Sequence, residues 1–447
     1  MGRLILSLSL PGMASMITLA LYNIIDTFWV ARLGHEAIAA LTIILPWNIL
    51  VIAIGVGSGI GISALTSRRF GEGNIEATNH AAGQVFPLSG LFGGIFLASA
   101  VFLPHPMLTF FGATQDIMDY ASQYLRIIGF GVPFLLLSIM NNNLLRGSGD
   151  ALRPMIFMIA GAVVNIILDP LLIFGIGPFP ELGVQGAALA TVIAQLISAG
   201  LNFSYIIARR SAYRIELHHL KPGLSILFDI YRVGFPSIIM QITESVTFIL
   251  LNNVLSTFGS LAIAAAGLVI RVADLAFMPA FGVSQGLLPI VGFNFGAHLW
   301  KRVWVAVKLA SGGLALFMAI TMVVLEIFAP EIIGIFSDDP ELITIAVPAM
   351  RIVMTSLFLI GPAILFVTTF QGLSKGKDAL ILSQTRQLVF LVPLLFLLPR
   401  IWGATGIWLS IPFSDALGFL VAGLWLFREY KMQQKAGNWS DIPARTS

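Results

Sequence analysis

Of the carboxylic acids inside long apolar stretches of the sequence, where a charged side chain has few partners, three are of most interest for chemistry. They are Asp26, Asp169 and Glu244. A carboxylate at the middle of a bilayer costs about 2.5–3.5 kcal/mol on insertion scales, so such acids are retained when they are paired, protonated or functional. We therefore take all three as candidates for ion or proton chemistry. The alternative for each is a structural acid held by hydrogen bonds near a helix end.

Asn165 and Asp169 are four residues apart and share one face of a helix. A carbonyl oxygen beside a carboxylate suits a hard cation such as Na⁺. Burial and a second negative charge nearby also favour the protonated form of a carboxyl, which makes a usable proton carrier. The pattern therefore supports either Na⁺ or H⁺ as an ion that binds at Asp26, Asn165 and Asp169, and we prefer H⁺.

Glu244 has no evident local partner in the sequence, with Gln241 and Thr247 one turn away on similar faces. We expect Gln241 and Glu244 to attract a cationic substrate or to take part in ion coupling. Arg271 and Asp274 are three residues apart on one helix, and we expect them to neutralise each other.

The elements that must position these residues are membrane-spanning helices. The chain has 447 residues, of which 57% are hydrophobic and 11% charged, and its mean hydropathy is +0.92. A spanning helix needs about 20 largely apolar residues. Runs of that kind lie at 5–32, 38–67, 79–103, 119–145, 151–175, 184–208, 225–257, 262–293, 303–328, 342–371, 377–399 and 404–427. We therefore expect an all-α membrane protein with twelve transmembrane helices.

The two halves of the sequence resemble each other at an offset of 225 residues. The matches pair 33–34 with 258–259, 37–40 with 262–265, 70–71 with 295–296, Pro11 with Pro236 and Gly147 with Gly372. Six spans precede the repeat point, so both halves have the same orientation and form two pseudo-symmetric six-helix bundles. The second half lacks the two acids of the first. Leu251 stands at the place of Asp26, and Val392 stands at the place of Asp169 in a shifted match of 169–172 with 392–395. Ion handling is therefore expected in the first half.

Basic residues fix the expected orientation. With the N-terminus in the cytoplasm, 17 of the 25 Lys and Arg residues fall on the inner side and only Arg32 and Arg400 on the outer side. We expect a multi-pass protein of the cell inner membrane with both termini cytoplasmic. The expected domains are an N-terminal lobe (1–208), a cytoplasmic linker (209–223), a C-terminal lobe (224–428) and a cytoplasmic tail (429–447).

Several functional classes are not supported. There are no cysteines, so disulfide and thiol chemistry is excluded. The glycine-rich run at 55–61 lies in an apolar span and lacks the Lys-Ser/Thr ending of a nucleotide-binding loop, so we interpret it as a close helix contact. The six His residues show no metal-ligand spacing. We expect no enzyme activity, no cofactor and no nucleic-acid partner.

Four segments together resemble the multidrug and toxic compound extrusion (MATE) family, and the resemblance covers nearly the whole chain. The segments are 21–28 with 33–34, 145–150, 165–170 and 186–191. The likeness is nearest to the DinF-type branch. It implies two six-helix lobes, efflux driven by Na⁺ or H⁺, and an ion site in the N-terminal lobe.

The resemblance also implies roles for particular residues. It places the ion site at Asp26, Asn165, Asp169 and Thr191, cavity positions at Tyr124 and Asn142, and a bend of the first helix near Pro11. Glu244 matches an acid of the NorM-type branch, whereas Ile360 replaces that branch's second acid.

The expected function is therefore ion-coupled antiport of amphipathic, mostly cationic drugs by alternating access, by a monomer in the lipid bilayer. The alternative is a flippase for lipid-linked saccharides or other lipids. A non-transporting membrane scaffold is the further rival, and the acids at mid-membrane argue against it.

Overall fold

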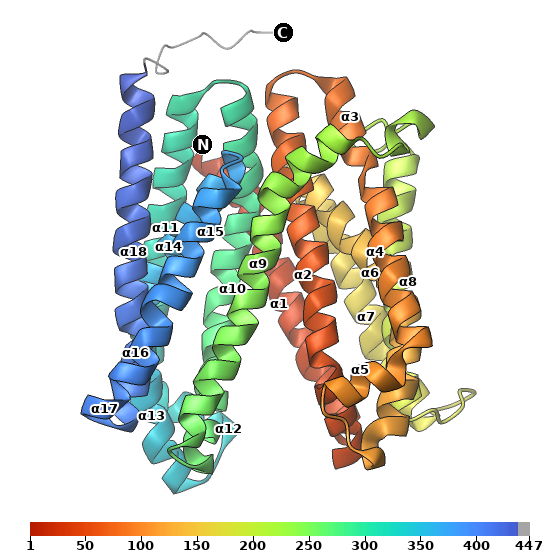
Figure 1. Cartoon of the computed structure of the whole chain (residues 1–447), viewed down its shortest axis with the longest axis vertical. Coiled ribbons are helices and arrows are strands. Elements are labelled where there is room, and N and C mark those ends of the chain that lie inside the picture. Colours follow the sequence, from red (N-terminus) through yellow and green to blue (C-terminus); the bar gives the residue numbers. More distant parts are fainter. Residues whose placement is uncertain (437–447) are drawn as a thin grey trace. The chain divides into compact units, whose positions relative to one another are not determined.

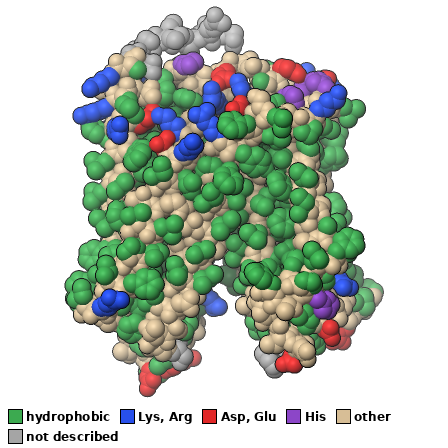
Figure 2. Space-filling model, viewed as in Figure 1, with side chains coloured by type: hydrophobic (Ala, Val, Ile, Leu, Met, Phe, Trp, Pro, Cys, Tyr) green, Lys and Arg blue, Asp and Glu red, His purple; other side chains and the backbone are tan. Residues whose placement is uncertain are grey.

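The described part of the chain is built from helices, without a β-strand among them. The structure is a computed structural model that describes residues 1–436, apart from the side chains of His35, Glu36 and Ser260. Eleven helical segments are long and apolar enough to span a membrane, and a bent pair of helices brings the number to twelve. Apolar side chains cover the flanks of these helices, and charged side chains gather near their ends (Figure 2). The predicted all-α membrane fold with twelve spans is confirmed.

By packing, the chain divides into two units. The N-terminal unit comprises residues 14–238, and the C-terminal unit comprises residues 1–13 together with residue 239 onward. The linker 209–223 thus packs with the N-terminal unit. The expected lobes, 1–208 and 224–428, were defined by the sequence repeat and not by packing, and they stay a prediction. Helix α18 runs to Lys435, so the first part of the expected tail is helical, and 437–447 lie outside the described residues.

The N-terminal unit is organised around one long helix, α6, which packs against α2, α4 and α8 (Figure 1). Four of its apolar side chains, Leu125, Leu136, Met140 and Leu144, are fully buried in the core of this unit. Its elements are α1 (Gly2–Ala31) from residue 14, α2 (His35–Gly71), α3 (Ile75–Gly83), α4 (Val85–Phe102), α5 (Pro104–Phe110), α6 (Gln115–Gly147), α7 (Leu152–Phe174), α8 (Val184–Ile207), the 3₁₀ helix η1 (Leu217–Leu220) and α9 (Leu224–Ser256) to residue 238.

In the C-terminal unit, α10 and α14 pack against each other and against α11 (Figure 1). Besides the remaining parts of α1 and α9, its elements are α10 (Ser260–Gly296), α11 (Trp300–Ile327), α12 (Ala329–Phe336), α13 (Pro340–Met354), α14 (Leu357–Gly372), α15 (Gly376–Gln384), the π-helix η2 (Thr385–Leu391), α16 (Val392–Leu397), α17 (Pro399–Trp402) and α18 (Ala404–Lys435). The span expected at 342–371 is the bent pair α13 and α14, which meet at an angle of 49°.

The glycine-rich run of α2 brings helices close together, as predicted from its small residues. A Cβ atom at Gly61 would lie 2.3 Å from the carbonyl oxygen of Ile230 on α9, and one at Gly57 would lie 2.8 Å from that of Gly234. These two glycines therefore allow backbone contact between α2 and the first part of α9, in the manner of other close helix pairs in membranes.

The same contact recurs in the C-terminal unit, 225 residues further along. There Gly282 and Gly286 of α10 meet the first part of α1, where a Cβ atom at Gly12 would lie 2.6 Å from the carbonyl oxygen of Gly282. The N-terminal unit therefore includes the first segment of α9, and the C-terminal unit includes the first segment of α1. The division falls after Met13 in α1 and after Ile238 in α9, in each case two residues beyond the repeated proline.

Candidate functional site

The N-terminal unit holds a polar cluster formed by α1, α7 and α8. Asp26 lies on α1, Asn165 and Asp169 lie on α7, and Thr191 lies on α8. Asn165 and Asp169 are completely buried, and Thr191 is 7% exposed. Because α7 and α8 pack closely, the i, i+4 pair on α7 faces Thr191 directly. The structure therefore brings together the four residues that the sequence singled out.

The amide of Asn165 joins the two helices. Its Nδ2 donates to Asp169 Oδ1 at 3.1 Å and to Thr191 Oγ1 at 3.3 Å. Since an ionised carboxylate only accepts hydrogen bonds, these contacts fix the amide nitrogen toward Asp169.

Three buried acceptor oxygens in this cluster have no donor among the described residues: Asp26 Oδ1, Asn165 Oδ1 and Asp169 Oδ2. The carboxyl groups of Asp26 and Asp169 also lie within hydrogen-bonding reach of each other. Two carboxylates at that distance repel strongly unless a proton or a cation is held between them. The donor set fits both a shared proton and a hard cation such as Na⁺, which takes carboxylate and amide oxygens.

Two tyrosines line the same cluster. Tyr124 of α6, which is 7% exposed, and Tyr22 of α1 both lie within electrostatic reach of Asp26 and Asp169. Tyr22 also faces Thr191. Tyr22 was not among the predicted site residues, although it precedes Asp26 by four positions and so shares its helix face, which was the signal available.

Asn142 is buried in α6, and its side-chain oxygen has no donor among the described residues. Its neighbour Asn141 is completely buried, and neither its amide nitrogen nor its oxygen has a partner in the described part of the chain. Each residue therefore has a buried amide oxygen without a donor in the described part of the chain, and Asn141 was not among the predicted site residues.

Gln241 and Glu244 belong to the C-terminal unit, on α9. Beside them, Gln384 Nε2 donates to Thr243 Oγ1 at 3.0 Å. Glu244 is half-buried and lies within electrostatic reach of Arg386 and Asp274. Its carboxylate makes no hydrogen bond or ion pair with the described residues, which leaves it available to a cationic ligand.

Arg386 is itself neutralised. Its Nη1 lies 2.8 Å from Asp415 Oδ1, and Ser356 donates to the other oxygen of Asp415 at 2.7 Å. Asp415 is thus a structural acid, held by Arg386 and Ser356. The expected pairing of Arg271 with Asp274 is wrong, because no ion pair joins them in the described structure and both side chains are exposed.

One further cluster resembles a metal site. Glu76, His218 and His219 bring their ligand atoms within 4.8 Å of one another. However, the backbone N–H of Glu216 donates to His219 Nδ1 at 2.9 Å, so the ring proton of a neutral His219 sits on Nε2 and points at Glu76 Oε1, 2.9 Å away. That nitrogen has no lone pair for a metal. The cluster therefore secures the linker to α3.

The linker is anchored at a second point by Tyr213. Its hydroxyl, fully buried, donates to the carbonyl oxygen of Leu144 at 2.7 Å. Burial raises the pKa of the Tyr213 phenol above its ordinary value, so the group keeps the proton that it donates.

Pro11 lies inside the continuous helix α1. Proline cannot donate the helical hydrogen bond to the fourth preceding residue, which weakens the helix at this point. Pro11 and its counterpart Pro236 both stand where a helix passes from one packing unit to the other. This position suits a hinge.

Comparison with known proteins places these features in a family. A model of the MatE family matches residues 11–171 and 236–397, two segments that start 225 residues apart. The multidrug export protein MepA of Staphylococcus saprophyticus is 29% identical over 433 residues, which are 96% of this chain and 94% of that protein. The FAD transporter of Shewanella oneidensis is 27% identical over 419 residues, or 93% and 92% of the two chains.

Solved structures agree with this likeness. A multidrug resistance MATE family transporter of the MOP superfamily, in an outward-facing conformation, superposes with a TM-score of 0.92 at 27% identity over 97% of each chain. A MOP superfamily transporter from Pyrococcus furiosus, whose binding pocket is reported to have reversed polarity, superposes with a TM-score of 0.91 at 27% identity over 97% of this chain and 96% of that one.

Proposed function

This chain belongs to the MatE family of multidrug and toxic compound extrusion transporters, and from that premise we propose that it exports amphipathic, mostly cationic compounds in exchange for protons. The protein is a multi-pass membrane transporter and not an enzyme. Under the proposal it works as a monomer in the inner membrane, with both termini in the cytoplasm.

The observation that carries the proposal is the buried acid pair of the N-terminal unit. Asp26 and Asp169 lie within hydrogen-bonding reach, and each has a carboxylate oxygen without a donor in the described structure. A proton that enters from outside relieves the repulsion between them and favours one state of the unit, and its release inward restores the other. Asn165 holds Asp169 in place through both states.

The energy available is sufficient for export. One proton moving through 100 mV supplies about 2.3 kcal/mol, and each pH unit adds about 1.4 kcal/mol. Together they support roughly a five-hundredfold concentration ratio for a neutral compound exported against one proton.

The proposal is tested with purified protein in proteoliposomes under separately imposed gradients. A pH jump in Na⁺-free buffer should drive accumulation of ethidium, a permanently charged dye, whereas a Na⁺ jump at clamped pH should not. Accumulation that requires Na⁺ and ignores the pH gradient would assign the same cluster to Na⁺. No accumulation under either gradient would refute antiport.

Phosphorylated flavins are a second candidate substrate, because the relative from Shewanella oneidensis carries the name FAD transporter. Glu244, when ionised, disfavours an anion and favours a cation. Parallel uptake of FAD and ethidium by the same vesicles decides between them, and uptake of FAD alone would replace the cationic substrate class. Translocation of a labelled lipid-linked saccharide would instead identify the flippase.

A further inference from the structure

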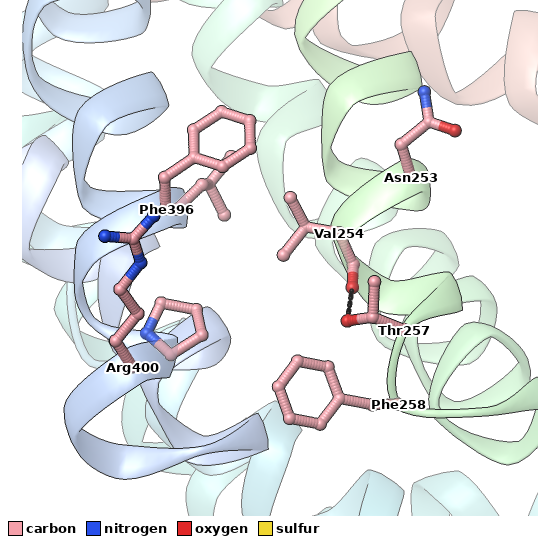
Figure 3. Close-up of a pocket in the computed structure, with 8 residues that line it drawn as sticks. Asn253, Val254, Thr257, Phe258, Phe396 and Arg400 are labelled. Atoms are coloured by element: carbon pink, nitrogen blue, oxygen red, sulfur yellow. Dashed lines mark hydrogen bonds between the residues drawn. The ribbon is translucent and has the colours of Figure 1, made fainter.

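The C-terminal unit contains an open pocket at the end of α9, away from Glu244. It lies between the last turn of α9 and the α16–α17 corner, and its volume is about 360 Å³ (Figure 3). This is within the range of small-ligand sites. The lining residues are Asn253, Val254, Thr257, Phe258, Leu395, Phe396, Pro399 and Arg400.

The wall of the pocket is mostly apolar, with the polar side chains of Asn253 and Thr257 and the positively charged side chain of Arg400. Phe258 and Phe396 approach from opposite sides, and Arg400 stands on the α17 side (Figure 3). Arg400 is the one charged residue of the lining, and among the residues that the structure describes it has no carboxylate partner. An exposed guanidinium beside aromatic rings is suited to an anionic group that is attached to an apolar body.

The internal repeat places a larger side chain at the position of one wall residue. Val254 corresponds to Trp29 in the N-terminal unit, at the offset of 225 residues. There the indole of Trp29 packs edge-on against Phe174 of α7, with ring centroids 6.0 Å apart. Arg32 lies over the same indole at 5.0 Å. At the corresponding position of the C-terminal unit, the valine side chain is much smaller than this indole.

The corner that carries Arg400 is held firmly. Gly406 of α18 packs so closely on α17 that a Cβ atom there would lie 2.3 Å from the carbonyl oxygen of Leu398. Gly403 adopts the positive φ of 57° that reverses the chain between the two helices. Arg400 is therefore presented from a fixed backbone and not from a loose loop.

The surface around the α16–α17 corner is apolar and exposed. Leu397, Ile401 and Trp402 are 54%, 68% and 50% exposed. Exposed tryptophan and arginine at the end of a spanning helix are typical of the bilayer interface, where lipid headgroups meet their acyl chains.

We propose that this pocket binds an anionic phospholipid, with the phosphate on Arg400 and the start of an acyl chain between Phe258 and Phe396. The interfacial position decides in favour of a lipid over a soluble anion, since a soluble ligand would gain little from the exposed apolar rim. The site is separate from the acid pair and from Glu244, so it does not depend on the proposed transport reaction.

The test is a titration of delipidated protein with phosphatidylglycerol, followed by native mass spectrometry. Arg400→Gln should weaken lipid retention roughly tenfold, as expected for loss of a charged hydrogen bond. Val254→Trp should weaken it as much by placing an indole in the pocket that Val254 lines. Arg32→Gln, which removes an arginine at the corresponding end of the N-terminal unit, is the matched control and should retain the lipid like the unaltered protein.

Three outcomes would overturn the proposal. Retention by Arg400→Gln equal to that of the Arg32→Gln control would show that Arg400 holds no lipid. Loss in Arg400→Gln with full retention in Val254→Trp would place the lipid outside the pocket. Displacement of the lipid by millimolar inorganic phosphate would show that the site takes a soluble phosphate and not a phospholipid.

Discussion

Replacing Asp26 by asparagine separates proton exchange from the structure of the acid pair. Asparagine has nearly the same size, and its amide nitrogen can donate to the carboxylate of Asp169, which lies within hydrogen-bonding reach. A hydrogen bond to a charged group contributes about 1.5–3 kcal/mol. We therefore expect the variant to fold. Its amide N–H is a permanent hydrogen-bond donor at the position where the carboxyl of Asp26 would bind and release a proton.

The size of the effect follows from the driving force. A difference of two pH units supplies about 2.7 kcal/mol per proton. For one-for-one exchange in vesicles without a membrane potential, that energy supports roughly a hundredfold accumulation of substrate. Asp26→Asn cannot exchange the proton, so the ratio should fall to about one, while facilitated equilibration of substrate persists.

The assay is ethidium accumulation in proteoliposomes at matched protein density after a pH jump. Asp119→Asn is the control, because it removes an exposed acid of α6 in the same unit and should keep the full ratio. Full accumulation by Asp26→Asn would refute the reasoning, as would an equal loss in Asp119→Asn.

Three further predictions concern other parts of the molecule. Glu244→Gln should slow transport of ethidium roughly tenfold more than that of an uncharged dye, because only the cation loses a charge contact; equal losses for both dyes would contradict this. Gly61→Val should separate α2 from α9, because a Cβ atom at this position meets the Ile230 carbonyl. The loss of about 1–3 kcal/mol in the free energy of unfolding should appear as a lower Tm in detergent. An unchanged Tm would show that the contact is unimportant. Tyr213→Phe should cost about 1–3 kcal/mol in the same assay by leaving the Leu144 carbonyl without its donor, and a Tm equal to that of the unaltered protein would refute the anchoring role.

The architecture was predictable because its signals are local. A run of apolar residues defines a span by itself, and the repeat of Pro11 at Pro236 needs only the sequence. The grouping of Asn165 with Asp169 was equally accessible, since four residues on a helix make one turn. Thr191, in contrast, could be placed beside them only by likeness to a family, because no local rule joins α7 to α8.

The features that were missed depend on contacts between distant residues. The bend between α13 and α14 has no proline at its break, and there Ser356 donates to Asp415, 59 positions away. The ion pair of Arg386 with Asp415 also depends on packing between helices. Arg271 and Asp274 were paired wrongly because they are close in sequence, which does not by itself bring two side chains together. Composition does not reveal that the first segments of α1 and α9 each pack in the other unit. The glycine contacts of these segments nevertheless repeat at the offset of 225 residues.

The most direct test of proton exchange at the acid pair is a measurement of proton release on substrate binding. Concentrated purified protein in weakly buffered detergent solution is mixed with ethidium while a pH indicator is followed. We expect release of about one proton per bound ethidium from the unaltered protein and none from Asp26→Asn. Binding without proton release by the unaltered protein, or the same release by Asp26→Asn, would contradict it.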